Sequence, residues 1–304
     1  MPSINILENR HIYDLTPPVP NSKLPVLVFV HGWLLSRHYW HPLVELLQST
    51  YQCLTYDARG FGDSQIANQS EQDNNASLDT SVNLPLEQLY PQDYSLHGYA
   101  RDLGCLLKSL NIENAWLVGH SLGGSIALWT ADLYPSIVKG AVCLNAGGGI
   151  YLKEEFERFR NAGQQLVKFR PRWLSLIPGL DLVFTRMMVA RPLRVKWGRQ
   201  RLMDFIQADE QAALGALLES TTEEEVHLLP QLVARLKQPV YFIAGDKDRV
   251  MEPKYVNHLA SFHHSFASTD GNVFQINNCG HLGMIEAPKE VAAILEQVFN
   301  KHFN

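Results

Sequence analysis

The run Leu117–Gly124 reads Leu-Val-Gly-His-Ser-Leu-Gly-Gly and constrains the fold more than any other segment of the chain. The apolar residues that lead into it predict a buried strand, and residues 125–133 predict a helix. So tight a connection between strand and helix leaves no room for side chains at Gly119 and Gly123. Ser121 is therefore expected at the tip of the turn, where its hydroxyl faces the free N–H groups that begin the helix.

Strands and helices alternate along most of the 304 residues, which predicts an α/β fold with a mostly parallel central sheet flanked by helices. Continuous apolar runs of the kind buried on both faces of a parallel sheet predict the strands. These are residues 25–30, 51–56, 115–118, 139–145, 239–244 and 273–276. Amphipathic patterns predict helices at residues 39–48, 96–110, 125–133 and 288–299. Residues 1–149 and 239–304 are expected to form this core domain.

Two segments interrupt the alternation. Residues 150–238 have a mostly helical pattern and are too long for a simple connection in a compact domain, so we expect an inserted helical cap, or lid. Residues 65–93 are rich in Asn, Gln, Ser and Asp, which predicts a polar surface insertion without a core of its own.

Two later loops contain partners for Ser121. A serine hydroxyl is nearly inert at neutral pH, so nucleophilic chemistry needs a base and a group that orients the base. The strand at 239–244 leads to Asp246 and Asp248, and the last strand leads to His281. Since the carboxyl ends of parallel strands meet at one edge of a sheet, an acid and His281 are expected beside the serine. Asp246 directly follows a turn glycine and is the better candidate to cap that turn.

The strand at 25–30 ends at His31-Gly32-Trp33. A strand that breaks at His-Gly lets the next peptide N–H point into the cleft. There the backbone N–H groups of Trp33 and Leu122 are expected to form an oxyanion hole for a tetrahedral intermediate. The Trp33 ring and His120 are expected to contact the substrate. His31 is expected to make a structural hydrogen bond that shapes the loop.

Together these motifs resemble the α/β-hydrolase superfamily, in particular its small capped serine hydrolases, which include esterases, perhydrolases without cofactors and related lyases. The segments that carry the resemblance are Phe29–Trp33, Tyr56–Ser64, Gly119–Gly124, Gly245–Asp248 and Gly280–His281. The resemblance implies that the acid occupies the Gly-x-x-Asp position, which is Asp248 here, followed by Pro253. It implies that Asp57 and Arg59 shape a turn rather than react. A serine at position 121 argues against the dehalogenase and epoxide-hydrolase branches, which use an aspartate there.

The expected function is that of a serine hydrolase acting on a carboxylic ester with an apolar acyl or alcohol group. Ser121 would attack, His281 would transfer the proton and Asp248 would orient the imidazole, through an acyl-enzyme intermediate. No cofactor and no metal are expected. Two alternatives stay open: a lyase of the menaquinone-precursor type that uses the same residues for proton abstraction, with cap arginines binding carboxylates, and a hydrolase-like binding protein with little turnover.

Residues 153–201 of the predicted cap carry many Lys and Arg residues, although the whole chain has a net charge of −5. Apolar runs such as Trp173–Pro178 and Met187–Val189 lie between them. This mixture is typical of helices in a lipid headgroup region. It equally suits a cap whose apolar face packs over the active site. Peripheral contact with a membrane surface is therefore a hypothesis.

The location predicted from the sequence is cytoplasmic. Residues 1–16 lack the basic and apolar regions of a secretory signal, and no stretch approaches the roughly 20 apolar residues of a spanning helix. Four widely spaced cysteines, at positions 53, 105, 143 and 279, predict reduced thiols rather than disulfides or a zinc site. The net acidic charge gives no reason to expect nucleic acid as a partner. The oligomeric state stays open.

Overall fold

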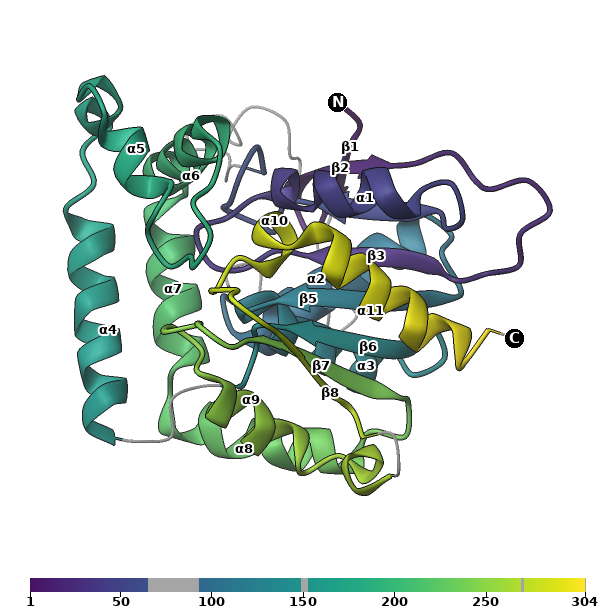
Figure 1. Ribbon diagram of the computed structural model, residues 1–304. Coiled ribbons are helices and arrows are strands. Elements are labelled where there is room, and N and C mark those ends of the chain that lie inside the picture. The colour runs from purple at the N-terminus through teal and green to yellow at the C-terminus, as the bar shows by residue number, and fades with distance from the viewer. Residues whose placement is uncertain (65–92, 149–152, 269–270, 304) are drawn as a thin grey trace, which may run out of the picture.

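The computed structural model describes residues 1–64, 93–148, 153–268 and 271–303. Within them, eight strands form one sheet in the order β1-β2-β4-β3-β5-β6-β7-β8 (Figure 1). Their bounds are β1 Ser3–Ile6, β2 Asn9–Leu15, β3 Val26–Val30, β4 Cys53–Tyr56, β5 Ala115–His120, β6 Val138–Leu144, β7 Val240–Gly245 and β8 Val273–Ile276. From β4 to β8 all neighbours pair in parallel, whereas β1 and β2 are antiparallel. The predicted α/β fold class is confirmed.

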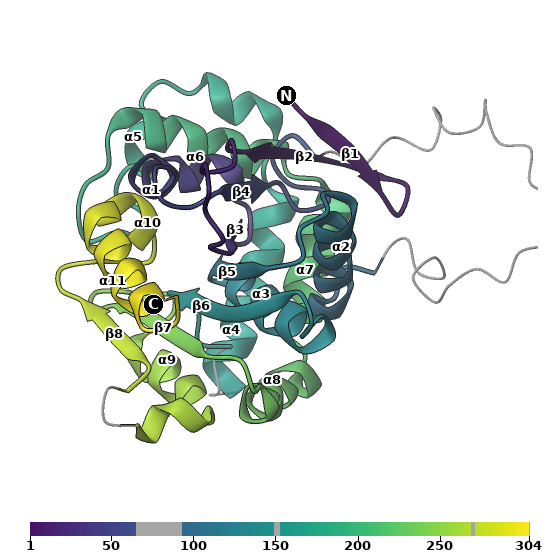
Figure 2. The ribbon, with the colours of Figure 1, turned by 90° about the vertical axis from the view of Figure 1, so that its right-hand side faces the viewer.

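Helices cover both faces of the sheet (Figure 2). One face carries α2 Leu96–Ser109, α3 Leu122–Leu133, α8 Glu223–Arg235 and α9 Pro253–Ala260. The other carries α1 His41–Leu47, α10 Gly283–Glu286 and α11 Pro288–Asn300. Two short 3-10 helices, η1 Arg37–Trp40 and η5 His264–Ala267, complete the connections. Because successive strand residues face opposite sides, Val28 and Val30 of β3 enter one core, and Leu27 and Phe29 enter the other.

The hairpin formed by β1 and β2 is absent from the sequence prediction. Its two-residue turn holds Leu7 and Glu8 at φ 46° and 65°. This is the left-handed backbone of a type I′ turn, which Asn-Gly or Asp-Gly usually signals. Leu-Glu gives no such signal, and the hairpin is recognised only from its pairing with β4.

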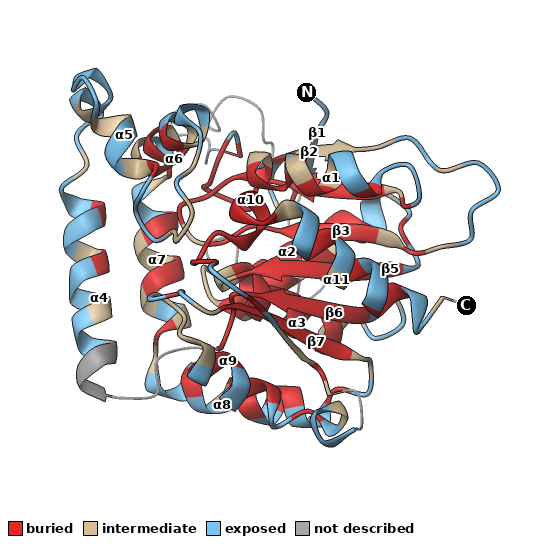
Figure 3. Cartoon of the chain, viewed as in Figure 1, coloured by how far each residue is buried: buried red, intermediate tan, exposed pale blue. Residues whose placement is uncertain are grey.

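Helices between β6 and β7 stand at the carboxyl edge of the sheet (Figure 1). They are α4 Lys153–Lys168, α5 Leu180–Phe184, α6 Val195–Gln207 and α7 Glu210–Ser220, with the 3-10 helix η4 Arg172–Leu176. We keep the name cap for these five helices, since α8, which follows them, packs against α3 at the side of the sheet. Figure 3 shows that α7 is buried where it faces the sheet, whereas α4 and α5 are largely exposed.

Further features of the chain bear on the sequence predictions. The predicted polar insertion at 65–93 lies outside the described residues, apart from Asp93. All four cysteines are free, and three of them are buried. Among the described helices, none has both the length and the apolar character needed to cross a membrane.

Candidate active site

Ser121 lies in a strained turn between β5 and α3, with φ 51° and ψ −121°. A residue other than glycine rarely adopts a positive φ, and such strain concentrates at functional sites. The flanking glycines have a steric reason. A Cβ at Gly119 would lie 2.2 Å from the carbonyl oxygen of Gly123, and a Cβ at Gly123 would lie 2.2 Å from that of Val30. Helix α3 begins at Leu122, three residues earlier than predicted, so its first turn starts directly after the serine.

His281 and Asp248 form a buried pair at the same edge of the sheet. The distance from His281 Nδ1 to Asp248 Oδ2 is 2.8 Å, and the two residues are 2% and 3% exposed. The other carboxylate oxygen accepts the backbone N–H groups of Val250 and Met251 at 2.8 and 2.9 Å. Burial alone would raise the pKa of Asp248, but the charge and hydrogen bond of His281 and these N–H groups hold it below its ordinary value. The carboxylate therefore stays charged beside the imidazole.

Asp246, the competing acid, has a different environment. Its Oδ1 accepts the backbone N–H of Cys279 at 3.2 Å, so it braces the loop that leads to the histidine. Of the two aspartates, the structure brings Asp248 against His281.

Asn145 is a residue of this site that the sequence analysis does not identify. It follows β6 directly, is fully buried and has φ 50°. Its Nδ2 donates to Asp248 Oδ2 at 2.9 Å and to the carbonyl of Gly280 at 3.2 Å. Asn145 thus joins the acid to the histidine loop. Its position at the carboxyl end of a predicted strand is the signal that could have found it.

His120 lines the cavity at the site, but its ring also supports His281. The distance from His120 Nε2 to the His281 carbonyl oxygen is 2.7 Å, and the two ring centroids lie 4.8 Å apart. Burial and the neighbouring His281 lower the pKa of His120 to about 3, so its imidazole is neutral. A neutral ring can donate only one N–H, and the carbonyl acceptor requires that proton on Nε2.

The loop after β3 is held by His31. Its Nε2 accepts the N–H of Ala58 at 2.9 Å, which leaves Nδ1–H to donate to the carbonyl of Gly32 at 2.8 Å. In a trans peptide the carbonyl and the next N–H point in opposite directions, so this bond fixes the direction of the Trp33 N–H. The Trp33 indole donates to the carbonyl of Ala213 in α7 at 2.9 Å, which ties the same loop to the cap.

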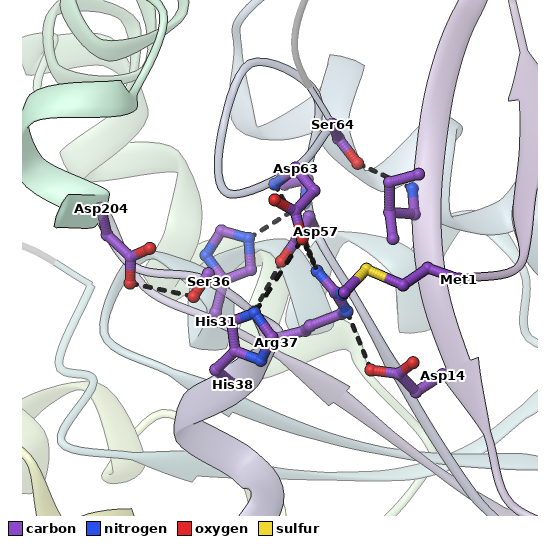
Figure 4. A network of polar contacts seen from close by, with 12 residues as sticks. Met1, Asp14, His31, Ser36, Arg37, His38, Asp57, Asp63, Ser64 and Asp204 are labelled. Carbon is purple, nitrogen blue, oxygen red and sulfur yellow. Dashed lines mark hydrogen bonds and ion pairs between the residues drawn. The ribbon is translucent and has the colours of Figure 1, made fainter. Parts of the chain in front are cut away.

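Beneath this loop lies a charged network centred on the buried Arg37 (Figure 4). Arg37 donates to Asp14 and Asp63, each at 2.8 Å, and also to Asp57. Asp57 Oδ1 in turn accepts the Arg37 backbone N–H at 2.7 Å. Arg59 is likewise buried, in an ion pair with an aspartate of α2. Asp57 and Arg59, the two residues expected to shape a turn, are each held in an ion pair with a side chain from another segment.

Glu286, which the sequence analysis likewise does not identify, fixes the loop of His281. Its carboxylate accepts the backbone N–H groups of Gly280 and Leu282 at 3.0 and 3.1 Å, and those of Ala190 and Arg191 at 2.8 and 3.0 Å. The last two belong to the segment between α5 and α6. One side chain thus connects the histidine loop to the cap.

Two cavities meet at Ser121. The larger, of about 340 Å³, is lined by Ser121, His281 and His120 and by apolar cap residues. The smaller, of about 90 Å³, is lined by Ser121, Leu122 and three hydroxyl-bearing residues, Ser125, Ser220 and Thr221. Trp33 lines both. In the described part of the chain no hydrogen bond joins the Ser121 hydroxyl to the His281 imidazole, a contact that in many enzymes tightens only when substrate binds.

Comparison with known proteins assigns the chain to a family. The model of the alpha/beta hydrolase fold matches residues 25–288. The chain is 31% identical to "Putative carbamate hydrolase RutD" of Escherichia coli O157:H7 over 132 residues, 43% of this chain and 41% of that protein, so the match spans less than half of the relative. It is 25% identical to the pimeloyl-[acyl-carrier protein] methyl ester esterase of Pseudoalteromonas atlantica, over 79% of this chain and 84% of the other.

Among solved structures, a thermophilic esterase from Thermogutta terrifontis superposes with a TM-score of 0.71 at 19% identity, covering 99% of both chains. At this identity the likeness concerns the fold. The family match covers most of the chain, including the turn of Ser121 and the loops of Asp248 and His281. The chain therefore belongs to the alpha/beta hydrolase fold family.

Proposed function

We propose that this protein is a serine hydrolase that cleaves carboxylic esters of apolar compounds through an acyl-enzyme intermediate. The observation that carries the proposal is the buried pair of His281 and Asp248, whose histidine lines the same cavity as a serine held at a strained strand-to-helix turn. A nucleophile and a base from two loops thus line one apolar cavity, and an acid from a third loop is hydrogen-bonded to the base, as nucleophilic catalysis requires.

In the proposed mechanism, His281 Nε2 takes the proton of Ser121 while Oγ attacks the ester carbonyl. The negative charge of the tetrahedral intermediate is held by the N–H groups of Trp33 and Leu122. His281 then gives the proton to the leaving alcohol, and water hydrolyses the acyl-enzyme in the same way. The hydrogen bond to Asp248 keeps the Nδ1 proton in place and stabilises the imidazolium.

The two cavities suggest where each part of the ester binds. His281 must reach the leaving oxygen to protonate it, and His281 lines the larger cavity. The alcohol part is therefore proposed to occupy the apolar cavity of about 340 Å³, and a short acyl group the cavity of about 90 Å³ beside Leu122. The substrate class is then a short-chain acyl ester of a large apolar alcohol.

The lyase alternative would use a cap arginine to bind a substrate carboxylate. Arg201 lines the larger cavity, but its guanidinium donates to the carbonyl of Met187 at 2.8 Å and to that of Phe184. Nη1 of Arg201 is thus engaged with two carbonyl groups, and the rest of the cavity lining is mostly apolar, which favours an apolar substrate over an anionic one.

A fluorophosphonate probe tests the proposal directly. Intact-mass analysis is expected to show one covalent addition on the wild-type protein, located on Ser121 by peptide mapping. Ser121→Ala is expected to keep the circular dichroism spectrum of the wild type and to show no addition and no turnover of 4-nitrophenyl acetate. Labelling of the alanine variant at the wild-type rate would overturn the assignment. Labelling of the wild type without turnover of any ester would instead favour the binding-protein alternative.

A further inference from the structure

We propose that the cap docks on an anionic lipid surface. The docking surface is made of η4, α5, the segments that connect them to each other and to α4 and α6, and the adjoining ends of α4 and α6. We call it the cap face. Its exposed apolar residues are Leu166, Phe169, Trp173, Leu176, Ile177, Leu182, Val183, Met187, Met188 and Val195. Its exposed basic residues are Lys168, Arg172, Arg186, Arg194, Lys196 and Arg199.

The distribution of exposed apolar side chains is the first observation. Ten of the fourteen large hydrophobic residues that are exposed in the described part of the chain belong to the cap face. Neither η4 nor α5 buries a single residue, and Leu176 and Trp173 are 79% and 59% exposed. Figure 3 shows α5 at the outer end of the cap, away from the sheet. A cluster of exposed apolar side chains of this kind marks a surface that contacts a membrane or another protein.

The charge of the cap face is a second, independent observation. Between residues 166 and 200 the chain has one acidic residue, Asp181, although the whole protein has a net charge of −5. Basic side chains that border tryptophan and aliphatic residues match the layered chemistry of a membrane surface, with anionic headgroups outside and acyl chains beneath. A protein partner would need a matching acidic and apolar groove, whereas an anionic bilayer supplies both chemistries without a shaped site.

The cap face is continuous with the larger cavity. Leu166, Met187 and Met188 are exposed on the cap face and also line the cavity that contains Ser121. An ester of an apolar alcohol would therefore pass from the lipid surface to the serine without crossing water. This last step rests on the proposed function, but docking itself does not.

Vesicle sedimentation of the full chain tests the proposal. We expect binding to phosphatidylcholine vesicles to rise strongly when phosphatidylglycerol is included, and to weaken as salt shortens the range of the charge attraction. The double variant Arg172→Glu/Arg186→Glu is expected to lower the partition coefficient at least about 25-fold, since each basic residue near an anionic surface accounts for about five-fold. Trp173→Ser/Leu176→Ser is expected to weaken binding to the same vesicles as well.

Matched controls separate the cap face from the rest of the surface. Lys23→Glu reverses an exposed charge elsewhere, and Phe266→Ser removes an apolar side chain of η5 that is 40% exposed. Both are expected to bind like the wild type. Ser121→Ala is also expected to bind unchanged, so a failure of the catalytic proposal and a failure of docking are distinguishable.

Three results would overturn the proposal. Equal sedimentation with neutral and anionic vesicles, or none with either, would exclude charge-assisted docking. Sensitivity to the charge variants but not to Trp173→Ser/Leu176→Ser would indicate a polyanion in solution. Concentration-dependent dimers in light scattering that disappear with Trp173→Ser/Leu176→Ser would show that a second copy of the chain covers the cap face.

Discussion

Asp246 and Asp248 lie two residues apart in one loop, yet each side chain contacts a different group. Both follow the same strand, and both were expected at the same edge of the sheet. Their roles differ because the loop turns after Gly245, so that Asp246 faces a backbone N–H and Asp248 faces His281. The pattern of glycines and apolar runs predicts the strand and the elbow, but it does not specify the direction of a side chain in the loop between β7 and α9.

The pair of aspartates gives a matched experiment. Asp248→Asn is expected to reduce kcat/KM by about four orders of magnitude, because an amide cannot hold the imidazole in the tautomer that catalysis needs. Asp246→Asn keeps an oxygen that can accept the Cys279 N–H, so its activity should stay within about ten-fold of the wild type. Both rates are measured with 4-nitrophenyl acetate. The opposite order of the two variants would transfer the orienting role to Asp246.

At the scale of elements, long apolar or amphipathic segments were predictable and contacts between segments were not. The six strands and four helices expected from periodicity are all present, although α3 begins earlier than its pattern suggests. Asn145 and Glu286 escape prediction because their partners include backbone groups and a carboxylate from remote segments. Only folding brings those groups together, and the one local signal is the place of Asn145 at the carboxyl end of a predicted strand.

The unequal cavities predict a preference between isomeric esters. Octyl acetate and methyl nonanoate have the same composition, but only octyl acetate places its long chain on the side of His281. We expect its kcat/KM to be at least about ten-fold higher, since a pocket that is too small for a few methylene groups discriminates by at least this factor. Release of free acid is followed by titration. Faster cleavage of methyl nonanoate would reverse the assignment of the two cavities.

A variant of α7 tests the same assignment from the protein side. Leu217 lines the smaller cavity, so Leu217→Val is expected to improve hydrolysis of butyrate esters relative to acetate esters. Leu218 is its half-buried neighbour and does not line either of the two cavities at Ser121. Leu218→Val should leave the butyrate-to-acetate ratio unchanged.

At the scale of the whole molecule, the cap is attached to the core through buried polar contacts as well as through packing. Asp204 of α6 accepts a hydrogen bond from the Ser36 hydroxyl of the core at 2.9 Å (Figure 4). It also accepts one from Gln200 in its own helix at 2.9 Å. The residue pattern of the cap predicts that it is helical. The place where it meets the core depends on single contacts between distant segments, such as the hydrogen bond from Ser36 to Asp204.

Asp204 also predicts how stability depends on pH. Burial raises its pKa to about 7, helped by the charge of Asp57 and opposed by hydrogen bonds from Ser36 and Gln200. In the unfolded chain an aspartate titrates near pH 3.9. Between about pH 4 and 7 the unfolded state therefore loses a proton that the native state keeps, so the stabilisation present at low pH declines as pH rises.

The declining contribution of Asp204 is measurable against a neutral variant. The free energy of unfolding of the wild type, relative to that of Asp204→Asn, should fall by up to about 1.4 kcal/mol per pH unit across this window and level off above pH 7. Urea unfolding at several values from pH 5 to 8 gives the difference. Ser36→Ala removes a hydrogen bond that favours the charged carboxylate, so it should extend the decline to higher pH. If wild type and Asp204→Asn instead follow parallel curves, the carboxyl group at the junction of cap and core is ionised throughout, and burial does not control its proton.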